Sequence, residues 1–285
     1  MRVGVIGHTG YEELPGILQG LLALAPELGL ELEFEDELHA AAGSGGKLGG
    51  TGSLDALLTL GGDGTLLRGA RLLAGARVPI IGINLGRLGF LTTCGTEEME
   101  RALRLFAAGE HVAEPRMALR ATAVDGDGVT KQEWLALNDF VVHKGGFARV
   151  VRLGLTVNRE SIGTYAADGV IISTPTGSTA YSLSAGGPVV VPTVESILIT
   201  PISAHALGVR PLIVPPEAEV TVDTSQSSET LLVTVDGQVG IELVPGENLV
   251  VRRASNPVHI VRLPGGSFFE RMRMKLGWGG PPDTE

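Results

Sequence analysis

The sequence predicts an α/β amino-terminal domain with a doubly wound, mainly parallel sheet. An all-β carboxyl-terminal domain follows, and a final helix returns to the first domain. Up to about residue 115, apolar strand-like runs alternate with helix-like runs, which is typical of parallel sheets with crossover helices. Beyond that point short β-branched or alternating runs are separated by turn residues about every ten positions, as in antiparallel sheets. We therefore place the α/β domain at 1–115 plus 262–285 and the β-rich domain at 116–261.

The predicted elements of the first domain follow from hydrophobic spacing. Leucines at helical intervals predict three helices, and the apolar runs between them predict buried strands. The strands are expected at 2–6, 30–34, 55–60 and 78–83, and the helices at 12–28, 66–74 and 97–108. Residues 43–52 are rich in glycine and are predicted to form a flexible loop.

The second domain is predicted to consist of short strands. They are expected at 117–124, 133–142, 149–157, 168–173, 196–200, 219–222, 230–235 and 249–253. The tail at 267–276 returns to helical spacing, and we expect it to pack on the first domain.

Composition and charge exclude several classes of function. The formal net charge is −10, opposite to that of a general nucleic-acid or anionic-membrane binder. The single cysteine, Cys94, excludes an intrachain disulfide and indicates a reducing compartment. Residues 1–6 read as a buried strand without the layout of a signal peptide, and 169–194 has too many prolines, glycines and hydroxyls for a membrane helix. We expect a cytoplasmic protein.

The turn Gly61-Gly62-Asp63-Gly64-Thr65 lies between a predicted strand and a predicted helix. Open α/β sheets bind ligands at such strand ends, and free N–H groups at a helix start attract phosphate. Asp63 is expected to be exposed there, where it could orient a hydroxyl, accept its proton or hold a metal ion. The alternative is a tight turn in which Asp63 only caps the helix. The turn matches neither the dinucleotide-binding nor the Walker A pattern.

Residues 168–188 form a second candidate binding segment. A short apolar strand opens into hydroxyl residues and glycines without any charge. Such a surface can hydrogen-bond sugar hydroxyls and phosphate oxygens, and Tyr181 could stack on a base. The alternative is a Ser/Thr-rich surface turn.

Other short motifs are weak by themselves. Asn138-Asp139 starts a predicted strand, and Asp236-Gly237-Gln238 is an ordinary hairpin signal. The histidines, which include His8, His143 and His205, show no metal-ligand spacing, so we expect structural roles for these three.

Taken together, these motifs resemble the NAD kinase family. The resemblance runs in order from about residue 54 to residue 278. It is carried by Gly61–Thr65, Gly82–Thr92, Asn138-Asp139, 168–188, Arg210-Pro211-Leu212, Asp236-Gly237-Gln238 and the tail from Phe268 to Trp278. The glycine turn alone also occurs in lipid kinases and phosphofructokinase relatives, whereas its combination with the Thr-Pro-Thr-Gly-Ser-Thr-Ala-Tyr segment is close to diagnostic.

The resemblance implies transfer of the terminal phosphoryl group of ATP to the 2′-hydroxyl of the adenosine ribose of NAD, which gives NADP. It implies that Asp63 is the catalytic residue and that Mg²⁺ arrives with ATP, near Asp63, without a metal site of its own. It implies that NAD is bound by Asp63, Gly64, Arg68, Asn138, Asp139, Arg149, Ala166, Asp168, Thr179, Ala180, Tyr181, Ser182, Leu183, Ser184 and Gln238.

Within this scheme Arg68 faces the phosphates, and Asn138 and Asp139 hold the ribose or base. Asp168 contacts the nicotinamide end beside Ala166, and 179–184 surrounds the adenine. The resemblance also implies a homodimer or homotetramer, without nucleic acid or membrane as a partner. It does not decide whether polyphosphate can replace ATP, whether NADH is accepted, whether NADP inhibits, or whether Asp63 is a general base or an orienting group.

The sequence departs from the family pattern at a few points. Asp139 stands where a glutamate is usual, so its contact requires a small shift or a water. The residues around His205 differ, and few family landmarks precede residue 54. Two alternative functions are a lipid kinase, which would need a more apolar cleft than 168–188 offers, and a catalytically silent dinucleotide sensor, which would be expected to lack Asp63. The loop 43–52 is a candidate for closing over the phosphate donor.

Overall fold

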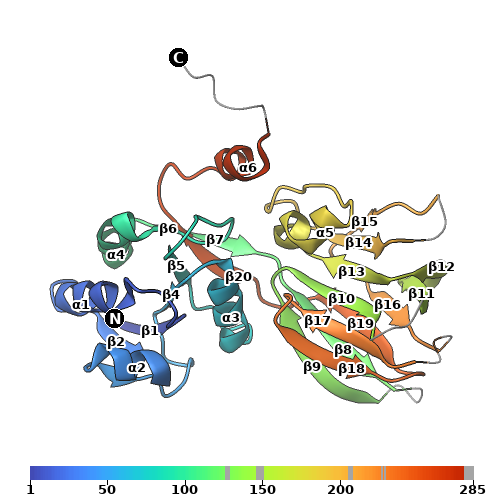
Figure 1. Ribbon diagram of the computed structural model, residues 1–285, viewed down its shortest axis with the longest axis horizontal. Coiled ribbons are helices and arrows are strands. Elements are labelled where there is room, and N and C mark those ends of the chain that lie inside the picture. Colours follow the sequence, from blue (N-terminus) through green and yellow to red (C-terminus); the bar gives the residue numbers. More distant parts are fainter. Residues whose placement is uncertain (126–128, 146–150, 205–207, 226, 228, 279–285) are drawn as a thin grey trace. The chain divides into compact units, whose positions relative to one another are not determined.

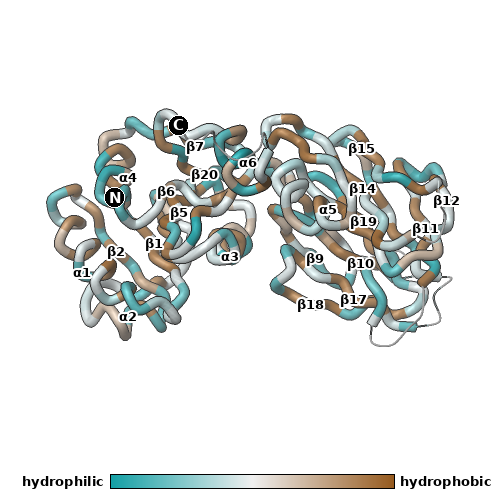
Figure 2. The backbone as a smooth tube through the Cα atoms, turned by 45° about the horizontal axis from the view of Figure 1, so that its top comes forward, coloured by the Kyte–Doolittle hydropathy of each residue, from teal (hydrophilic) through white to brown (hydrophobic). Residues whose placement is uncertain are grey.

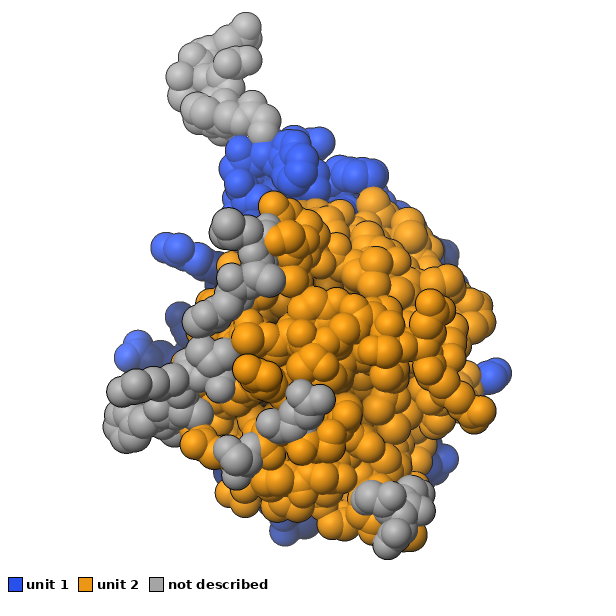
Figure 3. Space-filling view, turned by 90° about the vertical axis from the view of Figure 1, so that its right-hand side faces the viewer, with its two compact units in different colours: residues 1–115, 258–285 blue, residues 116–257 orange. Residues whose placement is uncertain are grey.

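The chain divides into two compact units. The computed structural model describes residues 1–278 except 126–128, 146–150, 205–207, 226 and 228 (Figure 1). Unit 1 contains residues 1–115 and 258–285, and unit 2 contains residues 116–257; Figure 3 distinguishes them by colour. The predicted boundary at residue 262 is wrong by four positions, because strand β20 (Val258–Arg262) joins the sheet of unit 1.

Unit 1 is built on a sheet with strand order β3-β2-β1-β4-β5-β20-β7, and β6 pairs with β5. The strands are β1 (Arg2–Gly7), β2 (Glu31–Phe34), β3 (Gly46–Lys47), β4 (Ala56–Leu60), β5 (Ile80–Asn84), β6 (Cys94–Gly95), β7 (Val112–Arg116) and β20. The helices are α1 (Leu14–Leu24), α2 (Asp36–Ala42), α3 (Asp63–Leu73), α4 (Met99–Ala107), preceded by the 3-10 turn η1 (Thr96–Glu98), and α6 (Phe268–Leu276).

The order of these strands creates a topological switch point. Strand β1 pairs in parallel with β2 on one side and with β4 on the other. The chain therefore winds outward in opposite directions from β1 and β4, and the connections that leave their adjacent carboxyl ends diverge. In open α/β sheets ligands bind in the crevice outside such a point. Gly7 and Gly61 lie at these two strand ends.

Helices cover both faces of the sheet, which confirms the doubly wound prediction. Leucines of α1 and apolar residues of α4 share one buried cluster with Val3, Val5 and Leu58. On the opposite face, Gly69 of α3 lies against Leu57 and Thr59. Because neighbouring residues of a strand point to opposite faces, the apolar runs must be hydrophobic at every position. This requirement explains the continuous runs in the sequence.

Unit 2 is a sandwich of two six-stranded antiparallel sheets. Their orders are β15-β14-β13-β10-β17-β18 and β12-β11-β16-β19-β8-β9. The strands are β8 (Leu119–Val124), β9 (Thr130–Ala136), β10 (Asp139–Lys144), β11 (Val151–Val157), β12 (Glu160–Ala167), β13 (Gly169–Ser173), β14 (Ile197–Ile202), β15 (Leu212–Val214), β16 (Val220–Asp223), β17 (Leu231–Val235), β18 (Val239–Leu243) and β19 (Asn248–Arg253). Two short helical segments, η2 (Thr176–Thr179) and α5 (Tyr181–Ser184), follow β13.

Both sheets of unit 2 contribute to one hydrophobic core. Phe140 and Ile172 from one sheet share a buried cluster with Leu153 and Leu249 from the other. Hydrophobic residues, drawn in brown, run along strands in both units (Figure 2). None of the helices in the described part of the chain is long and apolar enough to cross a membrane.

One predicted strand of unit 2 is divided in the structure. The run 133–142 contains the end of β9 and the start of β10, which belong to different sheets. The chain turns at Leu137 and Asn138, whose N–H groups donate to the carboxylate of Asp236. A side chain distant in the sequence therefore ends the strand, so the local pattern could not show the break.

Candidate active site

The glycine turn lies at the carboxyl end of β4, as the sequence predicts. Gly61 has a φ of +152°, and a Cβ there would lie 2.3 Å from Oγ1 of Thr65, so this position requires glycine. Helix α3 begins at Asp63, and its N-cap is Gly62, without a side-chain cap hydrogen bond. The interpretation of Asp63 as a helix cap is therefore wrong. Gly64 is exposed in the first turn of the helix.

The carboxylate of Asp63 is bound by the backbone of the segment that follows β5. Oδ2 accepts the N–H of Phe90 at 2.8 Å, and Oδ1 accepts those of Leu91 at 3.0 Å and Thr92 at 3.2 Å. Asp63 is therefore half-buried, and the prediction that it is exposed is wrong. Successive N–H groups form an anion-binding concavity of the kind that protein backbones offer to carboxylates and phosphates.

Glu35 anchors Arg68, which was predicted to face the phosphates. The Arg68 guanidinium donates to both carboxylate oxygens of Glu35, at 2.6 and 2.9 Å, and to the carbonyl of Gly7 at 2.8 Å. Hydrogen bonding to Glu35 raises the pKa of Arg68 above its ordinary value. Glu35 also accepts the N–H of Gly7. This network joins the ends of β1 and β2 to α3 at the switch point, where the Arg68 side chain is 43 % exposed.

In unit 2, Asn138 and Asp139 lie at the start of β10, beside Asp236 at the end of β17. The Asp236 carboxylate accepts the N–H groups of Leu137, Asn138 and Asp139. Asp236 has a φ of +50°, a conformation that aspartate adopts more readily than most residues. The hairpin signal in the sequence did not reveal this role, because the donors are nearly a hundred residues away.

Asp139 is a buried carboxyl group beside a second one. Its exposed fraction is 3 %. Burial, with a smaller contribution from the charge of Asp236, raises the pKa of Asp139 to about 7. Its carboxyl group therefore exchanges its proton near neutral pH. Perturbed carboxyl groups of this kind are frequent in functional sites.

The segment after β13 is fixed against Asn138. The N–H of Thr174 donates to the carbonyl of Asn138 at 2.9 Å, and its hydroxyl donates to the carbonyl of Leu137 at 2.6 Å. A Cβ on Gly177 would lie 2.2 Å from the Asn138 carbonyl oxygen, so only glycine fits here.

Many hydroxyls of this segment are internal, unlike the ligand-facing surface that we expected. Ser178 bonds to the backbone of Pro175 and Val190, and Ser182 shares a hydrogen bond of 2.9 Å with Thr200. The interpretation as a surface turn is also wrong, because Thr174, Thr176 and Ser178 are buried. Among the predicted contacts, Tyr181 and Ser184 are exposed and Thr179, Ala180 and Leu183 are half-buried.

The remaining predicted site residues of unit 2 belong to other elements. Asp168 forms an ion pair of 2.8 Å with Lys144, and Ala166 is exposed near the end of β12. Gln238 is exposed in the turn after β17. Arg149 lies outside the described residues.

The described histidines have local contacts. His8 accepts the N–H of Gly10, and the ring of His143 contacts the carbonyl of Lys144. His205 lies outside the described residues. Within the described residues no group of three or more His, Cys, Asp or Glu side chains could hold a metal ion.

Sequence reasoning missed Glu35 as a member of the site. Glu35 directly follows β2, at the same sheet edge as the glycine turn. Attention to every polar residue after a predicted parallel strand would have found it. Asp236 was noted as part of a family motif, but its contacts with the N–H groups of residues 137–139 were not predicted.

A glycine turn with a carboxylate, at the switch point of an open α/β sheet, is suited to binding phosphate-bearing ligands. The family models that match the chain place it in the class of kinases. Two family models match the chain: the ATP-NAD kinase N-terminal domain over residues 50–111 and the ATP-NAD kinase C-terminal domain over residues 137–263. The chain belongs to the NAD kinase family, which confirms the resemblance seen in its motifs.

Similar proteins cover most of the chain. An NAD kinase of Gemmatimonas aurantiaca is 59 % identical over 280 residues, which are 98 % of this chain and 97 % of that protein. An NAD kinase of Heliobacterium modesticaldum is 46 % identical over 226 residues, 79 % of this chain and 80 % of that protein.

Two solved structures share the fold. The structure of an NAD kinase from Archaeoglobus fulgidus in complex with ATP has a TM-score of 0.74 and 28 % identity, covering 97 % of this chain and 98 % of the other. Yeast NADH kinase complexed with NADH has a TM-score of 0.88, covers 100 % of this chain and 89 % of the other, and at 24 % identity shows the fold alone.

Proposed function

We propose that this chain transfers the terminal phosphoryl group of ATP to the 2′-hydroxyl of the adenosine ribose of NAD, giving NADP and ADP. The observation that carries the proposal is the 59 % identity, across 98 % of the chain, to a protein named NAD kinase. In the reaction the 2′-oxygen forms a bond to the γ-phosphorus, and the bond from that phosphorus to the bridging oxygen breaks. The hydroxyl proton leaves to a carboxylate or to water.

Asp63 is the proposed catalytic residue. Each carboxylate oxygen can accept about two hydrogen bonds. Oδ1 already accepts two N–H groups, whereas Oδ2 accepts one. Oδ2 therefore keeps the capacity to accept a hydrogen bond from the reacting hydroxyl. Because phosphoryl transfer depends mainly on alignment and charge neutralisation, a carboxylate held on three amides is suited to orient the hydroxyl.

The substrate contacts in unit 2 are proposed from the family resemblance. Asn138 and Asp139 hold the ribose or base of NAD, and Asp168 contacts its nicotinamide end. The adenine side is surrounded by 179–184, with Tyr181 and Ser184 exposed for contact. Arg149, Ala166 and Gln238 complete the proposed set in unit 2, and in unit 1 Gly64 and Arg68 follow Asp63 on α3.

The residues of unit 1 fit a metal ion that is delivered with its nucleotide. Mg²⁺ usually keeps several waters and contacts one or two carboxylates besides the phosphates. Within the described residues there is no cluster that would form a site of its own, and Asp63 is the carboxylate beside the glycine turn. When bound, Mg²⁺ would neutralise charge on the phosphates.

We also propose that the protein acts in the cytoplasm as a homodimer or homotetramer, without nucleic acid or membrane as a partner. The formal net charge of −10 supports the absence of nucleic-acid and anionic-membrane partners, and the single cysteine supports a reducing compartment. The oligomeric state is proposed from the family resemblance alone. Sedimentation of the purified chain would test the oligomeric state.

The first test measures NADP and ADP formed from NAD, ATP and Mg²⁺ by the natural chain and by Asp63→Asn. We expect robust product from the natural chain and a rate at least about a hundredfold lower in the variant, the usual size of an acid–base contribution. Circular dichroism and a thermal melt of both proteins check that the variant is folded. Reactions with polyphosphate in place of ATP define the donor.

Each outcome decides a different part of the proposal. Equal rates in the two proteins would keep the kinase and remove Asp63 as its catalytic residue. No NADP from the natural chain would overturn the proposed reaction, and assays with lipid acceptors would then separate a lipid kinase from a dinucleotide sensor.

A further inference from the structure

Three consecutive peptide groups connect Asp63 to two arginines. The peptides that join residues 89 to 92 donate their N–H groups to the Asp63 carboxylate. The carbonyls of the same peptides belong to Gly89, Phe90 and Leu91. A trans peptide points its N–H and its C=O in opposite directions. The side of the segment opposite Asp63 therefore presents a row of carbonyl oxygens.

Arg271 and Arg262 occupy that opposite side. Arg271, on α6, donates to the carbonyl of Gly89 at 3.2 Å and to that of Thr93 at 3.0 Å. Arg262, on β20, donates to the carbonyls of Phe90 at 3.1 Å and Leu91 at 2.9 Å. Both guanidinium groups also donate to the carbonyl of Thr92. Each of the three peptides thus lies between a carboxylate and a guanidinium.

The two arginines differ in how they are supported. Arg262 forms an ion pair of 3.0 Å with Glu114, and its side chain is only 13 % exposed. Helix α6, by contrast, contributes no buried residue to unit 1. The described contacts of α6 instead involve residues 89–93. Arg271 donates to carbonyls of these residues, and the ring of Phe268 lies 6.2 Å from that of Phe90. These contacts indicate that α6 has a role other than filling the hydrophobic core.

We propose that Arg271, together with Arg262, is a positioning residue for Asp63. The guanidinium groups hold the carbonyl side of residues 89–92, and this fixes the N–H groups that orient the catalytic carboxylate. Chains of hydrogen bonds polarise one another, so a cation on the carbonyl side strengthens the N–H bonds to the anion. The inference rests on the proposed function of Asp63.

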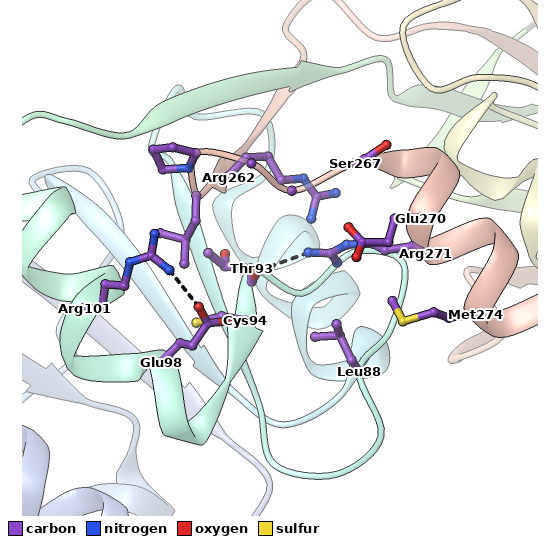
Figure 4. A pocket seen from close by; sticks show the side chains of 14 residues that line it. Leu88, Thr93, Cys94, Glu98, Arg101, Arg262, Ser267, Glu270, Arg271 and Met274 are labelled. Carbon is purple, nitrogen blue, oxygen red and sulfur yellow. Dashed lines mark hydrogen bonds and ion pairs between the residues drawn. The ribbon is translucent and has the colours of Figure 1, made fainter. Parts of the chain in front are cut away.

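A cavity beside the arginines offers a specific way to test this role. It has a volume of about 300 Å³ and is lined by both Arg262 and Arg271, with Thr93, Cys94, Glu98 and Met274 among the other lining residues (Figure 4). Removal of the Arg271 side chain would enlarge this cavity. A small guanidinium compound could then occupy the place of the missing group.

The experiment compares kcat and KM for NAD in the natural chain, Arg271→Ala, Arg271→Lys and the control Arg104→Gln. Arg104, on α4, donates to Glu27 and Glu100 at the surface, so its described hydrogen bonds lie outside residues 89–93. We expect a 10- to 100-fold lower kcat in Arg271→Ala, since a misplacement of about 1 Å can cost that much, with KM within about threefold of the natural value. Arg271→Lys should recover only part, because lysine lacks the planar fork. Arg104→Gln should keep the natural kcat. Methylguanidinium should raise the kcat of Arg271→Ala and leave that of Arg104→Gln unchanged.

A double variant distinguishes positioning from general stabilisation. If Arg271 acts through Asp63, then Asp63→Asn with Arg271→Ala should be no slower than Asp63→Asn alone. Full activity of folded Arg271→Ala, or losses that multiply in the double variant, would overturn the inference. High activity of Asp63→Asn would instead overturn the proposed role of Asp63, so the two failures are separable. If Arg271→Ala does not fold, the same comparison is made with Arg271→Lys.

Discussion

Because Gly89 has no side chain, the Asp63 carboxylate can lie directly against its backbone. A Cβ built on Gly89 would be 1.9 Å from Oδ1 of Asp63 and 2.3 Å from its Cγ. A side chain at this position must therefore displace either the carboxylate or the segment. We expect Gly89→Ala to lower kcat by about 10- to 100-fold, because a shift of about an ångström in the carboxylate that we propose as catalytic would cost that much. Steady-state NADP formation measures the effect.

Gly86 provides the matched control in the same segment. A Cβ there would lie 3.8 Å from Oδ1 of Asn84, an ordinary van der Waals distance. Gly86→Ala should keep a kcat within about twofold of the natural value. If both alanine variants lost activity equally, the close approach at Gly89 would not be the cause.

The carboxyl group of Asp139 makes stability depend on pH. Its pKa is raised from 3.8 to about 7 in the folded chain by burial and by the charge of Asp236. Between these two values the folded chain binds more protons than the unfolded chain, so this group makes stability fall as pH rises from about 4 to about 7. We expect Asp139→Asn to show a smaller loss of stability between pH 5 and pH 8 than the natural chain. Urea unfolding midpoints at the two pH values measure the difference.

Asp36→Asn is the control for this comparison. The Asp36 side chain is 86 % exposed, so its removal should leave the pH dependence unchanged. If the urea unfolding midpoints of the natural chain and of Asp139→Asn fell equally between pH 5 and pH 8, Asp139 would not be the group that makes stability depend on pH.

The residues of the site were predictable to different degrees. Asp63 stands in a glycine turn between a strand and a helix, and this local pattern carries its own signal. The partners of Asp63 are Phe90, Leu91 and Thr92, which use only their N–H groups and therefore leave no signature in the sequence. Arg271 and Gly89, whose carbonyl it contacts, are 182 residues apart in the sequence. No local sequence pattern could therefore predict this contact.

At the scale of elements, long periodic segments were predictable and short ones were not. The helix predicted at 12–28 corresponds to α1 (Leu14–Leu24), and the tail helix corresponds to α6 (Phe268–Leu276). Helix α2 has seven residues and β3 has two, too few to show a period. No strand was predicted at β20, and residues 258–261 were placed in the β-rich domain, because an alternating pattern does not specify which sheet a segment will join.

Helix α3 lies close to the sheet because of Gly69. A Cβ there would lie 3.0 Å from Cδ2 of Leu57 and 3.0 Å from Cγ2 of Thr59. A branched side chain would therefore push α3 away from β4. We expect Gly69→Val to destabilise the chain by about 1–3 kcal/mol, and urea unfolding measures this. A decrease of less than about 0.5 kcal/mol in the free energy of unfolding would contradict this prediction, because α3 would then accommodate the valine at little cost.

Gly20 in α1 is the corresponding control. No atom lies within 4 Å of a Cβ built there. Gly20→Ala should stabilise the chain by about 0.5–1 kcal/mol, since alanine favours a helix over glycine. Gly69→Val should therefore lower the stability of the chain and Gly20→Ala should raise it. The reason is that a Cβ at residue 69 meets neighbouring side chains, whereas a Cβ at residue 20 does not.

At the scale of the whole molecule, each unit has its own core. The buried cluster of the sandwich contains only residues between Met117 and Val251. The buried cluster around α1 contains residues from Val3 to Phe106 and, in addition, Val261 of β20. The core of unit 2 is thus contiguous in the sequence, whereas that of unit 1 requires a strand from the far end of the chain.

The position of β20 has a consequence for synthesis on the ribosome. This strand lies between β5 and β7 in the sheet, yet it is translated only after all of residues 116–257. Until then Ile80 at the start of β5 lacks its partner in β20, because β6 pairs only with Ile83 and Asn84 at the end of β5, and unpaired strand edges favour aggregation. The sandwich, which needs no later residue for its core, can close while it emerges, because domains fold as units during translation. The unit that begins to emerge first is therefore the one completed last.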